Sequence, residues 1–343
     1  MNDLTANLHT YLTTAPTSNF LQRPVEMLEA WEGSSNLLWR VSSGAQEAVV
    51  KLYLDAGQAR GRRQFDGQQL FAQRGLAPQP LWFDRYPAGL ARQVLVYTWA
   101  PGRRLEVTNA AHLAALAQSI AQVHSSDPTE VRRFCPNPLN LDYLWQVTQG
   151  GLGMIEQWLL AQKATALRRA LAALAANANA LVAAARPLWQ NTPPTPVHGD
   201  LKLENAIDSF GAAVLLDWEM FGLGDPAYEI AGFLQTVQAD LDAAAQEDWL
   251  QSYLATVDQP GLAQRIGIYQ RLLPFQAVCY LLHGLRQQPP AALPEIQANQ
   301  AFLVATLVTA FQQAALALQV APEALDEEIT ALLDTFLHES TAP

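Results

Sequence analysis

The chain has 343 residues, half of them hydrophobic and 15% charged, which predicts a folded protein with more than one compact unit. Its formal net charge of -11 argues against non-specific binding to nucleic acid or to an acidic membrane surface. No stretch of about 18 apolar residues and no signal-peptide pattern stand out, so we expect no membrane span and a cytoplasmic location. The cysteines, Cys135 and Cys279, are too far apart in sequence to indicate a zinc site or a disulfide framework.

Residues 1–98 carry strand and turn signals, with one helix among them. The helix is expected at roughly 59–74, where Gly75 supplies a stop signal. Short runs rich in β-branched and apolar residues predict four strands, at 25–28, 36–41, 48–54 and 93–97.

From Asn109 onward the pattern is helical, and Asn109 itself is a predicted helix cap. One long helix is expected over 154–186, and the prolines of 187–196 exclude a helix interior there. A short strand at 213–217 follows, and 228–337 is almost entirely helix-patterned. The sequence therefore predicts an α+β protein with a small β-rich lobe, 1–98, and a large, mostly helical lobe, 99–343.

The segment 198–205, His-Gly-Asp-Leu-Lys-Leu-Glu-Asn, concentrates polar groups directly after the proline-rich stretch. Asp200 could accept a proton from an attacking hydroxyl, and Lys202 could neutralise charge on a moving phosphoryl group. Asn205 and Asp217 offer oxygen ligands of the kind that bind magnesium. Phosphoryl transfer depends mainly on such positioning and charge neutralisation, so the spacing favours a phosphotransferase.

A loop Asp and Asn followed by a metal-binding Asp is the protein-kinase pattern. Here Gly199 stands in place of the usual Arg, and the metal motif reads Asp217-Trp218-Glu219. The chain thus resembles the aminoglycoside phosphotransferase and choline kinase superfamily, the small-molecule relatives of protein kinases. Residues 222–231 resemble that family's Gly-Asp-Pro turn, although Glu229 stands where the family usually has Asp. The resemblance implies a two-lobed, protein-kinase-like fold, ATP and Mg²⁺ as cofactors, and a small-molecule hydroxyl acceptor.

The resemblance also implies a nucleotide site in the first lobe. Lys51, in the strand at 48–54, would contact the α and β phosphates. The segment from Tyr97 to Trp99 would connect the lobes and hydrogen-bond adenine through its backbone. The turn that would cover the phosphates consists of Gly33, Ser34, Ser35 and Asn36. Without the resemblance, these four residues would be read as an ordinary hairpin turn.

The small-lobe helix lacks the glutamate that the kinase pattern requires, and the role of Glu219 stays open. Kinases pair the strand lysine with a glutamate on the small-lobe helix, but no Glu lies between Glu47 and Glu106. Gln64 could hydrogen-bond Lys51 instead, or Asp66 could replace the carboxylate. Glu219, expected to face the same side of a strand end as Asp217, could contact magnesium directly or indirectly, or be a solvent-facing charge.

Three functions remain open at this point. The first is a kinase for a small hydroxyl compound, its acceptor pocket built by the helices after Tyr228 together with 154–158. The second is a catalytically weak nucleotide-binding regulator, which the missing glutamate motivates, and the third is a protein kinase. The resemblance implies an amine-bearing alcohol, an aminoglycoside-like compound or a sugar-like compound as acceptor, and the acidic balance favours a cationic or amine-bearing one. His124 and His198 are expected to be structural, hydrogen-bonded side chains.

Overall fold

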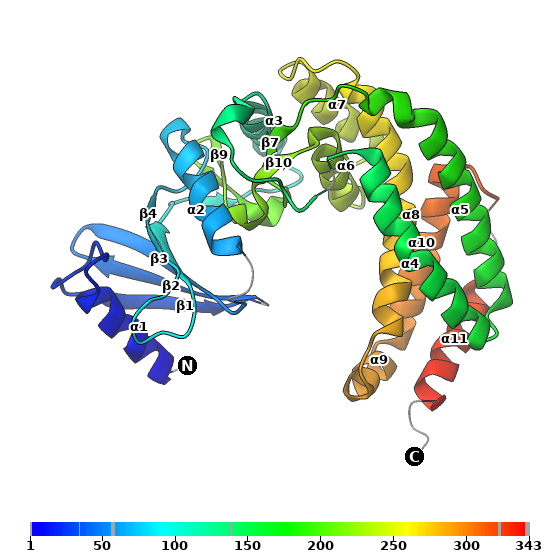
Figure 1. The fold of residues 1–343 in the computed structure, drawn as a ribbon, viewed down its shortest axis with the longest axis horizontal. Helices are drawn as coiled ribbons and strands as arrows, with labels where there is room; N and C mark the ends of the chain where they lie inside the picture. The colour runs from blue at the N-terminus through cyan, green and yellow to red at the C-terminus, as the bar shows by residue number, and fades with distance from the viewer. Residues whose placement is uncertain (1, 34, 56–58, 138, 322–323, 340–343) are drawn as a thin grey trace. The chain divides into compact units, whose positions relative to one another are not determined.

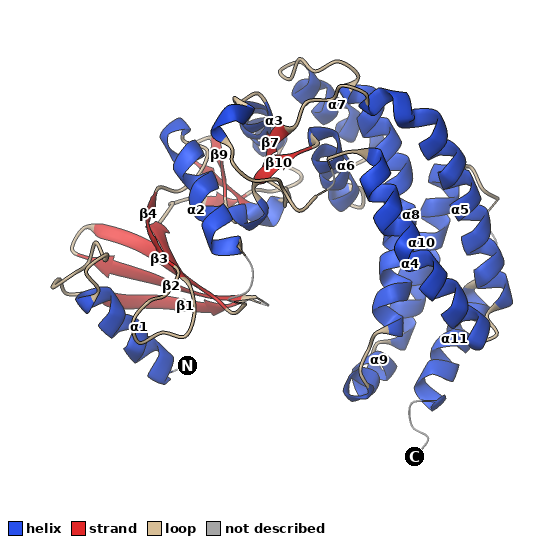
Figure 2. Ribbon diagram, viewed as in Figure 1, coloured by secondary structure: helices blue, strands red, loops and turns tan. Residues whose placement is uncertain are grey.

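The structure is a computed structural model that describes residues 2–33, 35–55, 59–137, 139–321 and 324–339. Its elements form two compact units, each described here by itself (Figures 1 and 2). The first unit comprises Met1–Asn137, Pro194–Glu229 and Thr236–Gln259, and the second comprises Pro138–Pro193, Ile230–Gln235 and Pro260–Pro343. The lobe boundary that the sequence predicts after residue 98 stays a prediction.

The first unit is built on a five-stranded antiparallel sheet with strand order β1-β2-β3-β5-β4. The four predicted strands are confirmed within a few residues, as β1, β2, β3 and β5. The fifth strand, β4, was missed because Pro80 opens it, and proline signals a turn more often than a strand. The strand bounds are Glu26–Glu32 (β1), Asn36–Ser43 (β2), Gln46–Tyr53 (β3), Pro80–Asp84 (β4) and Val94–Thr98 (β5).

Each face of the sheet is covered by one helix. Side chains alternate along a strand, so Trp39, Val41 and Val50 face a core that also includes Leu8 and Leu12 of α1, Asn2–Thr14. α1 has no counterpart among the elements predicted from the sequence. The other face carries Val49, Lys51 and Tyr53 of β3 and is packed by α2, Arg60–Phe71. This alternation places the Lys51 side chain on the α2 side of the sheet.

Further helices and short strands precede and follow the 198–205 segment in the first unit. The helices are α3, Ala110–His124, and α7, Ala243–Leu254, and the Asn109 side chain caps α3 as predicted. The small strands β6, Arg103–Arg104, β8, Ala206–Ser209, and β9, Ala212–Leu215, form one sheet. The strands β7, Thr195–Val197, and β10, Gly222–Gly224, pair antiparallel, and α6, Pro226–Val237, follows β10. Ile230–Gln235 of α6 belong to the second unit.

The strand predicted at 213–217 ends earlier than expected. β9 stops at Leu215, and Asp217 adopts a left-handed conformation with φ 58° and ψ 57° before a 3₁₀ turn over Trp218–Met220. The expectation that Asp217 and Glu219 lie on a strand end is therefore wrong, although both side chains contact Lys51. The turn, not a strand, carries Glu219.

The second unit consists of helices (Figure 2). The predicted single helix over 154–186 is wrong, because the chain forms two helices that break at Lys163. Lys163 is left-handed with φ 59°, its N–H bonds to Leu160 O at 3.1 Å, and the Ala164 N–H bonds to Leu159 O at 2.9 Å. These two bonds form the Schellman ending of a helix, which a glycine usually marks in the sequence. The helices are α4, Leu141–Ala161; α5, Thr165–Ala185; α8, Leu262–Arg286; α9, Leu293–Ala298; α10, Gln300–Leu318; and α11, Asp326–Glu339.

Two segments of this unit, Thr165–Trp189 and Gln300–Leu318, are long and apolar enough to cross a membrane by length and composition alone. One third of the most apolar window of each is buried inside the structure. Core helices of a folded unit pass the same test, so the expected absence of a membrane span stays a prediction.

The break between α4 and α5 can be tested at Lys163. We expect Lys163→Gly to raise the free energy of unfolding by up to about 1 kcal/mol, because a residue with a Cβ is strained in the left-handed region. The matched control, Gln157→Gly at an exposed interior position of α4, should lower it by about 1 kcal/mol. Urea denaturation of both variants measures this, and a destabilised Lys163→Gly would contradict the assigned helix ending.

Candidate functional site

Lys51 lies at the centre of a buried polar cluster in the first unit. Its side chain is 3% exposed, and its Nζ lies 3.0 Å from Gln64 Oε1, 2.7 Å from Asp217 Oδ1 and 2.5 Å from Glu219 Oε1. An ammonium has three N–H donors, so these three oxygens match its donor capacity. Of the two substitutes considered for the missing helix glutamate, Gln64 contacts the lysine, whereas Asp66 pairs with Arg62 and Arg133.

The carboxylate of Asp200 is held from one side and accessible on the other. Its Oδ2 accepts hydrogen bonds from Lys202 Nζ and Asn205 Nδ2, both at 2.8 Å, and its side chain is 40% exposed. Burial would lower the pKa of Lys202, but the hydrogen bond and charge of Asp200, with the charges of Asp217 and Glu204, raise it. Lys202 therefore keeps its positive charge beside Asp200, and Oδ1 of Asp200 is the oxygen left for a ligand.

Asn205 and Asp217 form a donor set that fits a hard cation. Asn205 Nδ2 also bonds to Asp200 O at 2.9 Å, which orients the amide and leaves Oδ1 as its ligand atom. Burial would raise the pKa of Asp217, but the charge and hydrogen bond of Lys51, with the charges of His198 and Lys202, lower it, so Asp217 is a carboxylate. One carboxylate and one amide oxygen, completed by substrate phosphates, suit Mg²⁺. Among the described residues, no group of three His, Cys, Asp or Glu side chains offers an alternative metal site.

The backbone of the His-Gly-Asp segment is fixed by Glu229, whose side chain is 2% exposed. Its carboxylate accepts hydrogen bonds from the N–H groups of His198, at 3.1 Å, and Gly199, and from His124 Nε2 at 2.8 Å. The Tyr253 hydroxyl lies 2.6 Å from the other ring nitrogen of His124. Burial would raise the pKa of Glu229, but the hydrogen bond and charge of His124, the charge of His198 and the Gly199 N–H lower it. Glu229 is thus a buried carboxylate that holds the start of the loop.

Gly199 is required where it stands. Its φ is +90°, and a Cβ at this position would lie 2.4 Å from Met220 O and 2.6 Å from Met220 Cβ. The arginine that protein kinases carry here could not fit against Met220 without a backbone shift. The Asn137 side chain secures the other side of the same peptide, donating to Gly199 O at 2.9 Å.

Trp218 joins the acidic turn to α2 and to the loop. It is fully buried, its ring stacks on Phe71 with centroids 4.8 Å apart, and it meets the His198 ring edge-on at 4.6 Å. His198 in turn donates from Nε2 to Leu216 O at 2.7 Å. The predicted structural roles of His198 and His124 agree with these contacts, since both rings are buried and hydrogen-bonded.

The predicted nucleotide turn lies between β1 and β2. Gly33 N–H bonds to Asn36 O at 2.9 Å, Ser35 O accepts from Leu54 N–H at 3.0 Å, and Asn36 Nδ2 donates to Glu219 Oε1 at 3.1 Å. Ser34, predicted to belong to this turn, lies outside the described residues. The turn is therefore tied through Asn36 to the acidic motif.

Tyr97 and Trp99 are both predicted to lie in the adenine-binding connection, but Tyr97 is buried and Trp99 is half-buried. Tyr97 is buried, and burial with the charges of Asp217 and Glu219 raises its pKa. The Trp99 N–H already donates to Glu47 O at 3.1 Å, and its ring packs between Trp31, in a stack at 6.2 Å, and the Arg40 guanidinium.

Sequence reasoning missed several supporting residues. Arg60 lies 3.7 Å from Glu219 across an ion pair, and Tyr253 and Asn137 hold the loop from distant segments. Arg60 carried a weak signal, because it lies one turn before Gln64 on the predicted helix. Tyr253 and Asn137 carried none, since their contacts join residues 129 and 62 positions apart.

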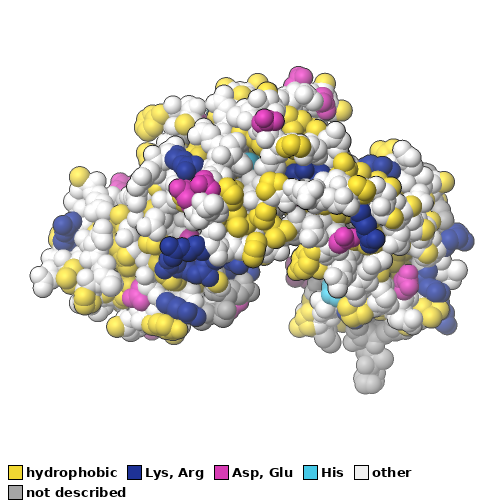
Figure 3. Space-filling model, turned by 45° about the horizontal axis from the view of Figure 1, so that its top comes forward, with side chains coloured by type: hydrophobic (Ala, Val, Ile, Leu, Met, Phe, Trp, Pro, Cys, Tyr) yellow, Lys and Arg dark blue, Asp and Glu magenta, His cyan; other side chains and the backbone are white. Residues whose placement is uncertain are grey.

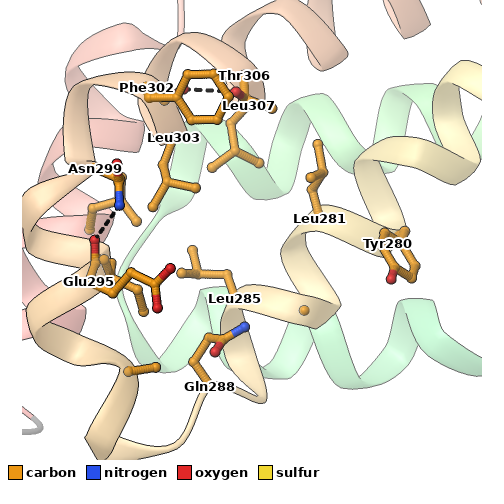
Figure 4. Close-up of a pocket in the computed structure, with 14 residues that line it drawn as sticks. Tyr280, Leu281, Leu285, Gln288, Glu295, Asn299, Phe302, Leu303, Thr306 and Leu307 are labelled. Carbon is orange, nitrogen blue, oxygen red and sulfur yellow. Dashed lines mark hydrogen bonds between the residues drawn. The ribbon is translucent and has the colours of Figure 1, made fainter. Parts of the chain in front are cut away.

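The second unit has a pocket of about 600 Å³ between its helices (Figure 4). Leu281 and Leu285 reach it from α8, Leu303 and Leu307 from α10, and Glu295 from α9. The residues lining it are not among the predicted catalytic, nucleotide or metal residues, but they lie on helices after Tyr228, where the acceptor pocket was predicted. On the face seen in Figure 3 most side chains are uncharged, and basic and acidic groups lie close together rather than in a wide field of one sign.

The role of Glu229 predicts a pH-dependent stability. Glu229→Gln should lower the free energy of unfolding at pH 7 by about 1–3 kcal/mol, because an amide NH₂ would face buried N–H donors. The folded pKa of Glu229 lies below its unfolded value, so its contribution is full above the unfolded pKa and is lost as the pH falls through the folded pKa. The difference between variant and wild type should therefore shrink below about pH 4.

Urea denaturation between pH 3 and pH 8 measures this difference, with Glu106→Gln at an exposed position as the control. The control should stay within about 0.5 kcal/mol of wild type at each pH. A Glu229→Gln variant as stable as wild type at pH 7, or a difference that grows in acid, would contradict the assignment.

Several solved structures share this fold at low identity. A choline/ethanolamine kinase family protein from Mesorhizobium loti is 18% identical, with 97% of this chain and 99% of that chain covered and a TM-score of 0.57. A putative aminoglycoside phosphotransferase from Ralstonia eutropha is 15% identical, with 92% and 97% covered and a TM-score of 0.63. A thermostable mutant of aminoglycoside phosphotransferase APH(4)-Ia, in ternary complex with AMP-PNP and hygromycin B, is 16% identical, with 86% and 93% covered and a TM-score of 0.55. These likenesses confirm the expected α+β, protein-kinase-like fold.

A search of curated proteins gave no match. The model of the phosphotransferase enzyme family matches residues 26–266, more than half of the chain. The matched range contains Lys51, the 198–205 loop, Asp217 and Glu229. The chain belongs to the phosphotransferase enzyme family.

Proposed function

We propose that this phosphotransferase moves the γ-phosphate of ATP to a hydroxyl group of a small molecule, with Mg²⁺ bound. The observation that carries the proposal is the Asp200 carboxylate, which Lys202 and Asn205 hold at one oxygen while the other stays accessible. A carboxylate in this state can orient an acceptor hydroxyl and take its proton. The same unit holds Lys51 and Asp217, groups suited to phosphate and to a cation.

Each side chain has one proposed task. Asp200 is the base for the acceptor hydroxyl, and Lys202, 2.8 Å from it, would face the charge that builds up on the transferred phosphoryl group. Lys51 would contact the α and β phosphates, under the turn formed by Gly33 to Asn36. Asn205 and Asp217 would hold magnesium, which neutralises phosphate charge when bound.

In the proposed function, Lys51 must give up a protein partner before it can bind a phosphate. All three of its donors are matched by protein oxygens, so it can meet a phosphate only by leaving at least one of them. Asp217 is the partner that Lys51 would lose, because a bound cation would compensate the charge of the Asp217 carboxylate in place of the lysine. The cluster as it stands therefore fits the nucleotide-free protein.

The proposed acceptor is an amine-bearing alcohol, an aminoglycoside-like compound or a sugar-like compound. The formal charge of -11 supports a cationic acceptor. The structural neighbours include a choline/ethanolamine kinase family protein and an aminoglycoside phosphotransferase bound to hygromycin B. Choline, ethanolamine and hygromycin B are compounds of this kind. The helices after Tyr228 are the proposed acceptor-binding region.

The role of Asp200 can be tested by Asp200→Asn. We expect kcat to fall by about 10²–10⁴-fold, the usual contribution of a positioned base, while nucleotide affinity stays near that of wild type. Asp240→Asn, at an exposed position outside the cluster, is the control and should leave kcat unchanged. Coupled ATP-consumption and calorimetric binding measure both, and an undiminished kcat in Asp200→Asn would refute the assignment.

The acceptor class can be tested with a panel of choline-like and ethanolamine-like alcohols, aminoglycosides and sugars. We expect ATP-dependent phosphorylation of at least one amine-bearing alcohol, detected by mass spectrometry of the product. ATP binding without any consumption, across the panel and with water as acceptor, would instead favour the catalytically weak regulator.

A further inference from the structure

We propose that Glu219 is the anionic partner that positions Lys51, in the place that kinases give to a glutamate on the small-lobe helix. This inference rests on the proposed function, in which Lys51 contacts the nucleotide. It assigns Glu219 a positioning role that differs from the magnesium contact considered for it from the sequence.

The helix α2 cannot supply a carboxylate to Lys51. Its only acidic residue is Asp66, whose carboxylate pairs with Arg62 at 2.8 Å and Arg133 at 3.3 Å. The helix residue that reaches Lys51 is Gln64, which is neutral. Gln64 Oε1 is also shared with the Tyr53 hydroxyl at 2.8 Å, so it is only a partial acceptor for the ammonium.

Glu219 has the burial and the partners that such a role requires. Its side chain is 8% exposed, and Oε1 lies 2.5 Å from Lys51 Nζ. A solvent-facing charge, one of the alternatives from the sequence, is excluded by this burial. A buried carboxylate needs cationic or donor partners on both oxygens, and Glu219 has Asn36 Nδ2 at Oε1 and Arg60 at Oε2.

These partners distinguish Glu219 from Asp217. The Asp217 side chain is 35% exposed. Among the described contacts with small-lobe residues, its one partner is Lys51. Asp217 can therefore turn to a cation with the loss of a single ion pair. Glu219 is held at the same time by β2, β3 and α2, through Asn36, Lys51 and Arg60. Moving it to a metal would leave Asn36 and the buried Lys51 ammonium without this carboxylate.

The shared oxygen adds a second effect. Oε1 of Glu219 accepts from both Lys51 and Asn36, and Asn36 ends the turn that would cover the phosphates. Glu219 therefore sets the position of the lysine and of the turn together. Loss of its charge should weaken nucleotide binding even when no metal is present.

The test exchanges the charges of the two residues that face Lys51. Glu219→Gln removes the carboxylate, Gln64→Glu places one on α2, and the double variant restores the total charge at the kinase-like position. For each protein we would measure the Kd for ATP in EDTA by calorimetry, the Mg²⁺ concentration at half-maximal activity, and the melting temperature. Asp66→Asn, outside the Lys51 cluster, is the control.

We expect Glu219→Gln to raise the metal-free Kd for ATP about tenfold or more, the scale of one lost hydrogen bond to a charged group. Gln64→Glu should restore that Kd in the double variant, while the Mg²⁺ requirement stays close to that of wild type. If Glu219→Gln does not fold alone, recovery of folding by Gln64→Glu supports the same pairing, and failure to recover overturns it.

A Glu219→Gln variant with an unchanged metal-free Kd and a raised Mg²⁺ requirement, not rescued by Gln64→Glu, would overturn the inference and make Glu219 a metal ligand. Failure of the proposed function is distinguishable from this result. In that case the wild-type protein itself would neither bind ATP in EDTA nor consume it with Mg²⁺.

Discussion

A lysine ammonium that is almost fully buried is stable only where oxygens surround it, and the first unit is organised around one such group. Lys51 comes from the middle of the sheet, Gln64 from α2, and Asp217 and Glu219 from the turn after β9. Lys51 and Asp217 alone are 166 positions apart in the sequence. The need to satisfy a single charge thus fixes where the helix and the acidic turn lie relative to the sheet. In the proposed function, a phosphate competes with these oxygens for the lysine and a cation competes with the lysine for Asp217.

A second buried charge fixes the 198–205 loop. Glu229 binds the N–H groups of His198 and Gly199, and His124 and Tyr253 complete its surroundings. Asp200 follows directly, so the direction in which its carboxylate points depends on Glu229, which lies 29 positions later in the chain. Trp218 packs against both regions, through Phe71 of α2 and through His198. Trp218 therefore links the turn that carries Glu219 to the loop that Glu229 holds, through apolar packing.

Local sequence signals predicted the strands β1, β2, β3 and β5, the helix α2 and the cap of α3, because each depends on neighbouring residues. The break at Lys163 could not be predicted, since a lysine occupies the left-handed position that glycine usually marks. The spacing of Asp200, Asn205 and Asp217 indicated a phosphotransferase because these three residues lie close together in the sequence, so their pattern can be recognised there. The pairing of Lys51 with Glu219 could not be read from the sequence. It needs Asp217 in a left-handed conformation and a 3₁₀ turn after it, and neither has a local signal where a strand was expected.

The central claim is that the Lys51 cluster is a nucleotide site in its unliganded state. A crystal structure of the protein with AMP-PNP and MgCl₂ tests it most directly. The account predicts Lys51 Nζ within hydrogen-bonding distance of an α or β phosphate oxygen, Asp217 turned away from the lysine, and Glu219 still paired with it. A structure in which the nucleotide binds elsewhere and Lys51 keeps Gln64, Asp217 and Glu219 as its partners would contradict the account.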